Sequence, residues 1–172
     1  MSKILLALDQ STTTTGFAIF SDRKLIKSGT ISFSESDYLK RTVRLKTWML
    51  SLIQDLGSGN VEVALEDIQL QHYEPNGGKI QSKDFGVTTY KKLAHLQGVL
   101  MATCLEYNIK CTVTPPSTWR KTCNIQGSYR NEKKQGTVEF IEKQYNKTVS
   151  SDEADAICLG YHVLQEQGLD WS

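Results

Sequence analysis

The sequence predicts an α/β domain in which helices flank both faces of a five-stranded mixed sheet. Two apolar runs, residues 4–9 and 61–66, each end in an acidic residue, which is typical of strands buried on both faces. Two short strands follow the first run, and helical patterns separate the later strands, so we expect both antiparallel and parallel pairing. The length of 172 residues is close to that of one domain, so we expect residues 1–172 to form a single domain.

The order of the expected elements narrows the fold class. Residues 4–9, 16–20 and 25–33 are expected to form an antiparallel meander, because the turns between them are short and polar. Residues 36–56 predict a helix with Leu39, Val43, Trp48, Leu52 and Leu56 near one face. Residues 69–83 predict a mobile loop. The remaining predicted elements are strands over 61–66 and 109–113 and helices over 88–107, 117–122, 131–145 and 151–167. This order is typical of the ribonuclease H-like fold.

Charge and cysteine spacing exclude several classes of protein. The 20 basic and 19 acidic residues give a net charge of +1, which neither favours nor excludes nucleic acid as a partner. Residues 120–147 nevertheless carry a surplus of four positive charges, whereas residues 148–172 contain five acids and no Lys or Arg. The four cysteines lack CxxC spacing, so we expect reduced, packed thiols rather than a zinc or redox site. With neither a signal peptide nor a membrane span expected, the predicted location is the cytoplasm.

Four acidic residues are candidates for a metal site. Asp9 and Glu66 end the first and fourth predicted strands, and Asp152 and Asp155 share one face of the last helix. Taken singly, Asp9 could belong to a turn, Glu66 could be solvated, and Asp152 could stabilise the helix start after Ser150. Asp155 fits no such interpretation, because its neighbours in the helix are apolar and a buried carboxylate requires a partner. Clustered carboxylates favour Mg²⁺, and two such ions predict phosphodiester hydrolysis by activated water.

A basic stretch and an aromatic loop are candidates for DNA contact. Arg120, Lys121, Arg130, Lys133 and Lys134 lie within fifteen residues. Lys133 and Lys134 are near a helix start, where they oppose the helix dipole, so phosphate binding explains them better than helix stability does. We interpret Trp119 as a core residue. In the loop after Glu66, Tyr73 is the first candidate for stacking on an unpaired base and Phe85 is the second.

Three segments resemble the RuvC family of Holliday junction resolvases. They are LALDQSTTTTGFAIF, VALEDIQ and SSDEADAICLG, and PPSTWRKTCNIQGSYRNEKK is similar to the phage-borne branch of that family. The resemblance implies that Asp9, Glu66, Asp152 and Asp155 bind two Mg²⁺ ions, with Mn²⁺ as a substitute. It implies paired nicks in four-way DNA junctions, with forks and flaps as related substrates. The extra acid Glu153 is a potential competing ligand.

The second long helix is apolar over more than one stripe, which favours a homodimer, as the resemblance also implies. No feature supports a branch-migration helicase as partner. If the chain is encoded by a phage, the host cytoplasm is the expected compartment.

Two other functions remain open at this point. LDQSTTTTG also resembles the first phosphate loop of sugar kinases and other actin-like ATPases, although no second glycine-rich loop follows it. A non-catalytic protein that binds branched DNA is the other alternative. Such a binder has no reason to place four carboxylates beneath phosphates.

Overall fold

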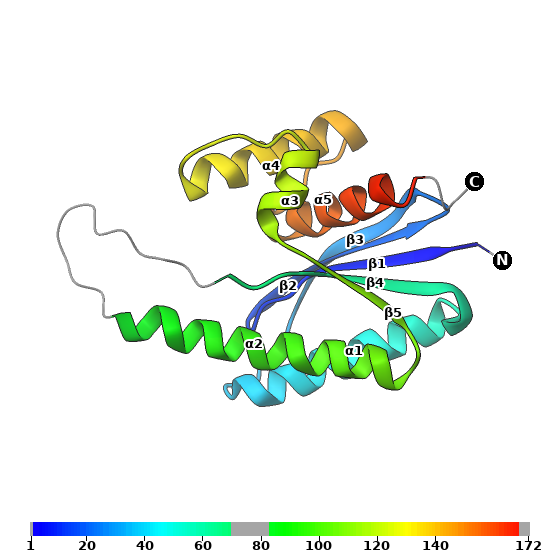
Figure 1. Cartoon of the computed structure of the whole chain (residues 1–172), viewed down its shortest axis with the longest axis vertical. Helices are drawn as coiled ribbons and strands as arrows, with labels where there is room; N and C mark the ends of the chain where they lie inside the picture. Colours follow the sequence, from blue (N-terminus) through cyan, green and yellow to red (C-terminus); the bar gives the residue numbers. More distant parts are fainter. Residues whose placement is uncertain (1, 70–82, 169–172) are drawn as a thin grey trace.

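Five strands form one mixed sheet in the order β3-β2-β1-β4-β5 (Figure 1). The computed structural model describes residues 2–69 and 83–168. The first three strands pair antiparallel, whereas β4 lies parallel to both β1 and β5. This is the predicted mixed sheet. The strands are β1 (Ile4–Asp9), β2 (Thr14–Ser21), β3 (Lys24–Ser32), β4 (Val61–Glu66) and β5 (Lys110–Thr114).

Helices cover both faces of the sheet, as predicted. Helices α1 (Tyr38–Asp55) and α2 (Lys83–Glu106) lie on one face, and a short 3₁₀ helix, η1 (Ser58–Asn60), precedes β4 (Figure 1). The other face carries α3 (Pro116–Thr122), α4 (Arg130–Tyr145) and α5 (Ser151–Glu166). Helix α2 begins five residues before the predicted start at Thr88. Most of the predicted loop, residues 70–82, lies outside the described residues.

The core has two layers, one on each side of the sheet. Leu6 and Leu8 of β1 face the α1/α2 side, whereas Leu5 and Ala7 face the side of α5. The strand is therefore buried on both faces, which explains its continuous apolar pattern. Helix α5 packs tightly on the sheet, because a Cβ atom on Gly160 would lie 2.2 Å from the ring of Phe20.

The predicted inner face of α1 is partly wrong. The helix buries Thr42, Leu45, Met49 and Ile53, whereas Leu39 and Val43 are exposed. Trp48, Leu52 and Leu56 are half-buried against the same core, as the prediction required. The apolar residues of this helix form two overlapping stripes, and the packing of α1 against the sheet and α2 decides which one is buried.

The expected free thiols are present. All four cysteines are free thiols, and Cys104, Cys123 and Cys158 are buried. Within residues 2–69 and 83–168, no helix combines the length and the hydropathy that crossing a membrane requires.

Candidate active site

Asp9 and Glu66 end neighbouring parallel strands. Leu8 of β1 pairs with Leu65 of β4, and each is followed directly by the acidic residue that ends its strand. Burial raises the pKa of Asp9 well above its ordinary value, and the negative charges of Glu66, Asp155 and Asp152 raise it further. The structure therefore brings the four acids into one electrostatically coupled cluster at the carboxyl ends of β1 and β4.

Asp155 lies on the buried face of α5. Its side chain is mostly enclosed, and burial raises its pKa to about 6, against the opposing effects of the cations Arg120 and Lys134. Its Oδ1 atom is buried and has no hydrogen-bond partner among the described residues. A buried carboxylate oxygen without a donor is costly, so this atom is available to a cation.

Glu66 is held by two residues from other elements. The side-chain amide of Gln10 donates to the main-chain oxygen of Glu66, and the main-chain N–H of Glu66 donates to Gln10 Oε1 at 3.2 Å. The indole Nε1–H of Trp119 donates to Glu66 Oε2 at 2.8 Å. Burial nevertheless raises the pKa of Glu66 to about 7, with Asp155 adding to the shift. Both the backbone and the carboxylate of Glu66 are thus fixed by buried donors.

Trp119 is a core residue, as predicted, and it also contacts the acidic cluster, which sequence reasoning missed. Its side chain is fully buried on α3. The available signal was general, because a buried indole N–H usually finds an acceptor. The guanidinium carbon of Arg120 lies 4.7 Å from the centre of the Trp119 ring, and its positive charge opposes the raised pKa values of Asp155 and Glu66.

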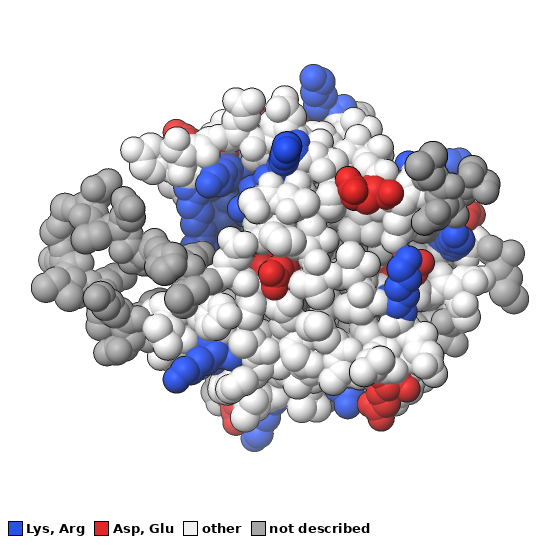
Figure 2. Space-filling view, in the orientation of Figure 1, with Lys and Arg blue, Asp and Glu red and all other residues white. Residues whose placement is uncertain are grey.

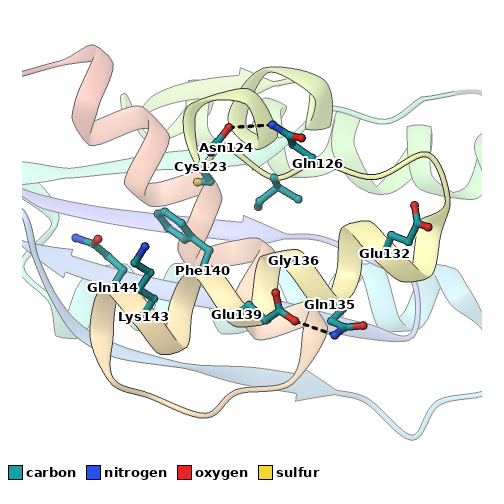
Figure 3. Close-up of a pocket in the computed structure, with 11 residues that line it drawn as sticks. Cys123, Asn124, Gln126, Glu132, Gln135, Gly136, Glu139, Phe140, Lys143 and Gln144 are labelled. Carbon is teal, nitrogen blue, oxygen red and sulfur yellow. Dashed lines mark hydrogen bonds between the residues drawn. The ribbon is translucent and has the colours of Figure 1, made fainter.

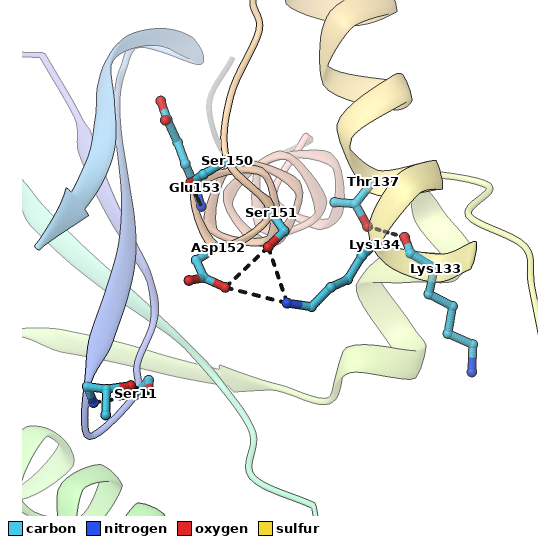
Figure 4. Close-up of polar contacts among 9 residues, drawn as sticks. Ser11, Lys133, Lys134, Thr137, Ser150, Ser151, Asp152 and Glu153 are labelled. Atoms are coloured by element: carbon cyan, nitrogen blue, oxygen red, sulfur yellow. Dashed lines mark hydrogen bonds and ion pairs between the residues drawn. The ribbon is translucent and has the colours of Figure 1, made fainter. Parts of the chain in front are cut away.

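Asp152 and Glu153 point in different directions from the first turn of α5 (Figure 4). Lys134 Nζ lies 3.9 Å from Asp152 Oδ1 and donates to Ser151 Oγ at 3.2 Å. Glu153 instead accepts hydrogen bonds from Ser28 at 2.8 Å and Lys147 at 2.7 Å. Glu153 is therefore turned away from the cluster in which Asp152 lies.

A cleft of about 1040 Å³ contains all four acids. Polar residues of the β1–β2 turn, including Ser11 and Thr13, line one side. The opposite side is formed by α3, the start of α4 and the turn before it. The basic residues that line it are Arg120, Arg130, Lys133 and Lys134. Figure 2 shows Lys and Arg side chains gathered on the side of the molecule where β1 and β4 end.

The remaining residues predicted to contact DNA are placed differently. Lys121 is exposed on α3 but does not line the cleft. Tyr73 lies outside the described residues, and of Phe85 only the backbone position within α2 is described. Tyr129, at the start of α4, lines the cleft and is 70% exposed. It is an aromatic residue that we did not select as a DNA contact from the sequence.

A second hollow lies between α4 and the turn after α3 (Figure 3). It measures about 630 Å³ and is lined by residues 123–126 and by α4 from Glu132 to Gln144. Gln135 and Glu139 are joined there by a hydrogen bond of 2.8 Å. None of the predicted site residues that the structure describes lines this hollow, so it is separate from the acidic cleft.

The donor set fits a hard divalent cation. It consists of carboxylate oxygens, of which Asp155 Oδ1 is buried without a donor. No three His, Cys, Asp or Glu side chains among residues 2–69 and 83–168 are arranged to hold one ion together. A hard divalent cation that one or two carboxylates bind, with water completing its coordination, is compatible with this arrangement.

Comparison with known proteins gives consistent likenesses over almost the whole chain. No family model matches the sequence. RuvC crossover junction endodeoxyribonuclease from Rickettsia akari is 24% identical over 170 residues, which span 94% of this chain and 98% of the relative. The Rickettsia typhi protein of the same name is 24% identical over 167 residues, with 94% and 96% covered.

Solved structures agree with these relatives. Thermus thermophilus RuvC in complex with a Holliday junction substrate matches with a TM-score of 0.69 at 12% identity, covering 98% of this chain and 96% of that chain. In both sequence and fold, the chain resembles RuvC. The yeast mitochondrial Holliday junction resolvase matches with a TM-score of 0.55 at 12% identity, covering 95% of this chain and 79% of that chain. The RuvC-like architecture confirms the predicted ribonuclease H-like fold.

Proposed function

We propose that the chain is a divalent-cation-dependent endonuclease that nicks Holliday junctions and related branched DNA. One observation carries this proposal: acids from β1, β4 and α5 meet in a cleft whose opposite side is basic. The full-length likeness to crossover junction endodeoxyribonucleases supports the choice of substrate. We further propose that residues 1–172 act as one nuclease domain.

Asp9, Glu66, Asp152 and Asp155 would hold two Mg²⁺ ions, or Mn²⁺ in their place. When bound, such ions supply activation of water and stabilisation of the attacking and leaving oxygens. The protein contributes the orientation of the four carboxylates, which line one cleft. Hydrolysis by water predicts nicks with 5′-phosphate and 3′-hydroxyl ends, which ligase seals directly.

The basic side of the cleft would hold the DNA backbone. Arg130 and Lys133 lie at the start of α4 and line the cleft without an ion pair among the described residues. They are therefore available to phosphates. The positive charges of Arg120 and Lys134 act on Asp155 and oppose the rise of its pKa. Tyr129 would stack on an unpaired base near the branch point, together with the sequence candidates Tyr73 and Phe85.

Two copies of the chain would form the active enzyme, because a four-way junction presents two opposed strands to cut. Helix α2 exposes Gly98, Met101, Ala102 and Leu105 along one side, and Leu105 is 80% exposed. Small residues between larger apolar ones allow two helices to approach closely. We expect Leu105→Glu to shift the protein from dimer to monomer in sedimentation experiments. A Leu105→Glu variant that still sediments with the mass of a dimer would refute this interface.

Cleavage of a substrate panel tests the function. The purified chain is incubated with a four-way junction, a fork, a flap and a duplex, each with Mg²⁺, Ca²⁺ or EDTA. Nicking of the junction with Mg²⁺ and binding without nicking in Ca²⁺ are expected. Tight junction binding without nicking in any cation would indicate a non-catalytic binder. A thermal shift with ATP and no nicking would indicate the ATPase alternative.

A further inference from the structure

The indole of Trp119 is the side-chain donor to the carboxylate of Glu66 in the described part of the chain. Its Nε1–H lies 2.8 Å from Glu66 Oε2, and the two residues are 53 positions apart. The tryptophan side chain is fully buried, so its N–H has no access to solvent and depends on Glu66 for a hydrogen bond. The hydrogen bond fixes which way the Glu66 carboxylate faces.

Hydrophobic packing alone does not explain a tryptophan at this position. Trp119 packs within the cluster that includes Leu5, Ala64 and Ile141, beneath α5. An apolar ring would fill that space without placing a polar N–H among these side chains. A buried N–H aimed at a carboxylate forms a charge-assisted hydrogen bond, which is stronger and more directional than a neutral one.

One face of the same ring contacts a cation. The guanidinium carbon of Arg120 is 4.7 Å from the ring centre, and Arg120 Nε is buried without a hydrogen-bond partner among the described residues. Trp119 thus orients one acid through its edge and one cation through its face. Both of these groups line the cleft.

We propose that Trp119 is a positioning residue, whose indole N–H holds the Glu66 carboxylate in the orientation that binds a divalent cation. This inference rests on the proposed cation-dependent function, which it deepens by a residue outside the acidic cluster. Outer partners of metal-binding side chains typically contribute about 10–100-fold to metal affinity. Trp119 acts through Glu66 and need not contact DNA or cation itself.

Cation binding without DNA provides the test. Trp119→Phe removes the N–H and keeps an aromatic face for Arg120. In a calorimetric titration with Mn²⁺ alone, we expect the dissociation constant to rise by about tenfold. Junction affinity in EDTA should be unchanged. Replacement of Trp119 by benzothienylalanine removes the N–H at nearly constant ring size, so it separates this effect from a packing defect if Trp119→Phe is unstable.

Two comparisons make the result specific. Trp48→Phe is the matched control, because Trp48 packs on the opposite face of the sheet. It should leave Mn²⁺ affinity unchanged. In a Glu66→Gln background, Trp119→Phe should have no further effect on Mn²⁺ binding, because its target carboxylate is gone.

Unchanged Mn²⁺ affinity in Trp119→Phe and in the benzothienylalanine protein would overturn the proposal. An equal loss in Trp48→Phe, or a full additional loss in the Glu66→Gln background, would also overturn it. Should the wild-type protein bind Mn²⁺ in the expected Trp119-dependent manner but cleave no DNA, the positioning role would stand and the proposed nuclease function would fail.

Discussion

A Cβ atom on Gly16 would lie 1.9 Å from the main-chain oxygen of Asp152, so β2 and the first turn of α5 meet backbone to backbone. Gly16 is also the register partner of Asp9 across the β1–β2 pair. The contact therefore sets how closely the acids of α5 approach the acid of β1. No side chain larger than a hydrogen atom fits between these two elements without moving one of them.

Gly16→Ala should displace the start of α5 and abolish cleavage. Overpacking of this kind typically costs about 1–3 kcal/mol of stability, and each 1 kcal/mol lowers the Tm of a chain of this size by about 2–4 °C. Circular dichroism melting and junction cleavage measure the two effects. Gly59→Ala is the control, because an added Cβ there meets nothing within 4 Å. Wild-type cleavage by Gly16→Ala would contradict the importance of this contact.

Asp152→Asn should reduce cleavage strongly, and Glu153 should not compensate. From the sequence, Glu153 next to Asp152 predicts a mild effect, but Glu153 is held by Ser28 and Lys147 on the side of β3. Single-turnover cleavage of the junction is measured for Asp152→Asn, Glu153→Gln and the double variant. We expect Glu153→Gln to cleave like the wild type and the double variant to match Asp152→Asn. A further loss in the double variant would show that Glu153 acts as a substitute ligand.

Asp9→Asn, Glu66→Gln and Asp155→Asn should each abolish cleavage and leave junction binding intact, because they remove carboxylates and not phosphate contacts.

Stability of the cation-free protein should fall as the pH rises from about 5 to 8. The pKa of Glu66 is raised to about 7 and that of Asp155 to about 6, so the folded state holds more protons than the unfolded state in this window. This stabilisation of the folded state is complete below the ordinary carboxylate pKa of about 4. It is lost as the pH rises through the raised pKa values of the two folded-state carboxylates. Melting curves in EDTA at pH 5.5 and pH 8 check this.

Glu66→Gln removes one of these buried charges, so its Tm should depend less on pH than that of the wild type. Mg²⁺ at pH 8 should restore part of the wild-type Tm. The predicted sign would be contradicted if the Tm of the wild-type protein in EDTA were higher at pH 8 than at pH 5.5, and if this increase exceeded the one measured for Glu66→Gln.

Lys133→Ala should weaken binding to every DNA shape. Loss of one phosphate contact should reduce the salt slope of binding by about 0.9. Affinity for junction and duplex across a salt series is the measurement. Lys121→Ala is the matched control, because Lys121 is exposed but does not line the cleft. If both variants change the slope equally, the cleft does not define the phosphate-binding surface.

Tyr129→Ala should impair junction cleavage and leave duplex binding unchanged. Stacking on an unpaired base is worth about 1–3 kcal/mol, which corresponds to a loss of about tenfold or more in single-turnover rate. Tyr129→Phe should retain the rate, because the ring face is kept. Tyr73→Ala, measured in the same assay, tests the sequence candidate. Equal weakening of duplex and junction by Tyr129→Ala would show that this residue does not recognise the branch.

Local sequence patterns determined the strands along the chain and the acids that end β1 and β4. The runs before Asp9 and Glu66 are apolar because β1 and β4 are buried on both faces, and parallel pairing then places both acids at one edge. Asp155 is recognisable because a carboxylate within an apolar helix requires a partner. These inferences use burial and periodicity, which a sequence records directly.

Only the tertiary structure decided which groups meet the acids. Trp119 donates to Glu66 across 53 residues, and Arg120 and Lys134 reach Asp155 from α3 and α4. The rotation of α5 sends Asp152 toward Lys134 and Glu153 toward Lys147. The partner of a polar side chain depends on how elements distant in the sequence pack together, and the periodicity of one element records its buried face but not the neighbours it meets there.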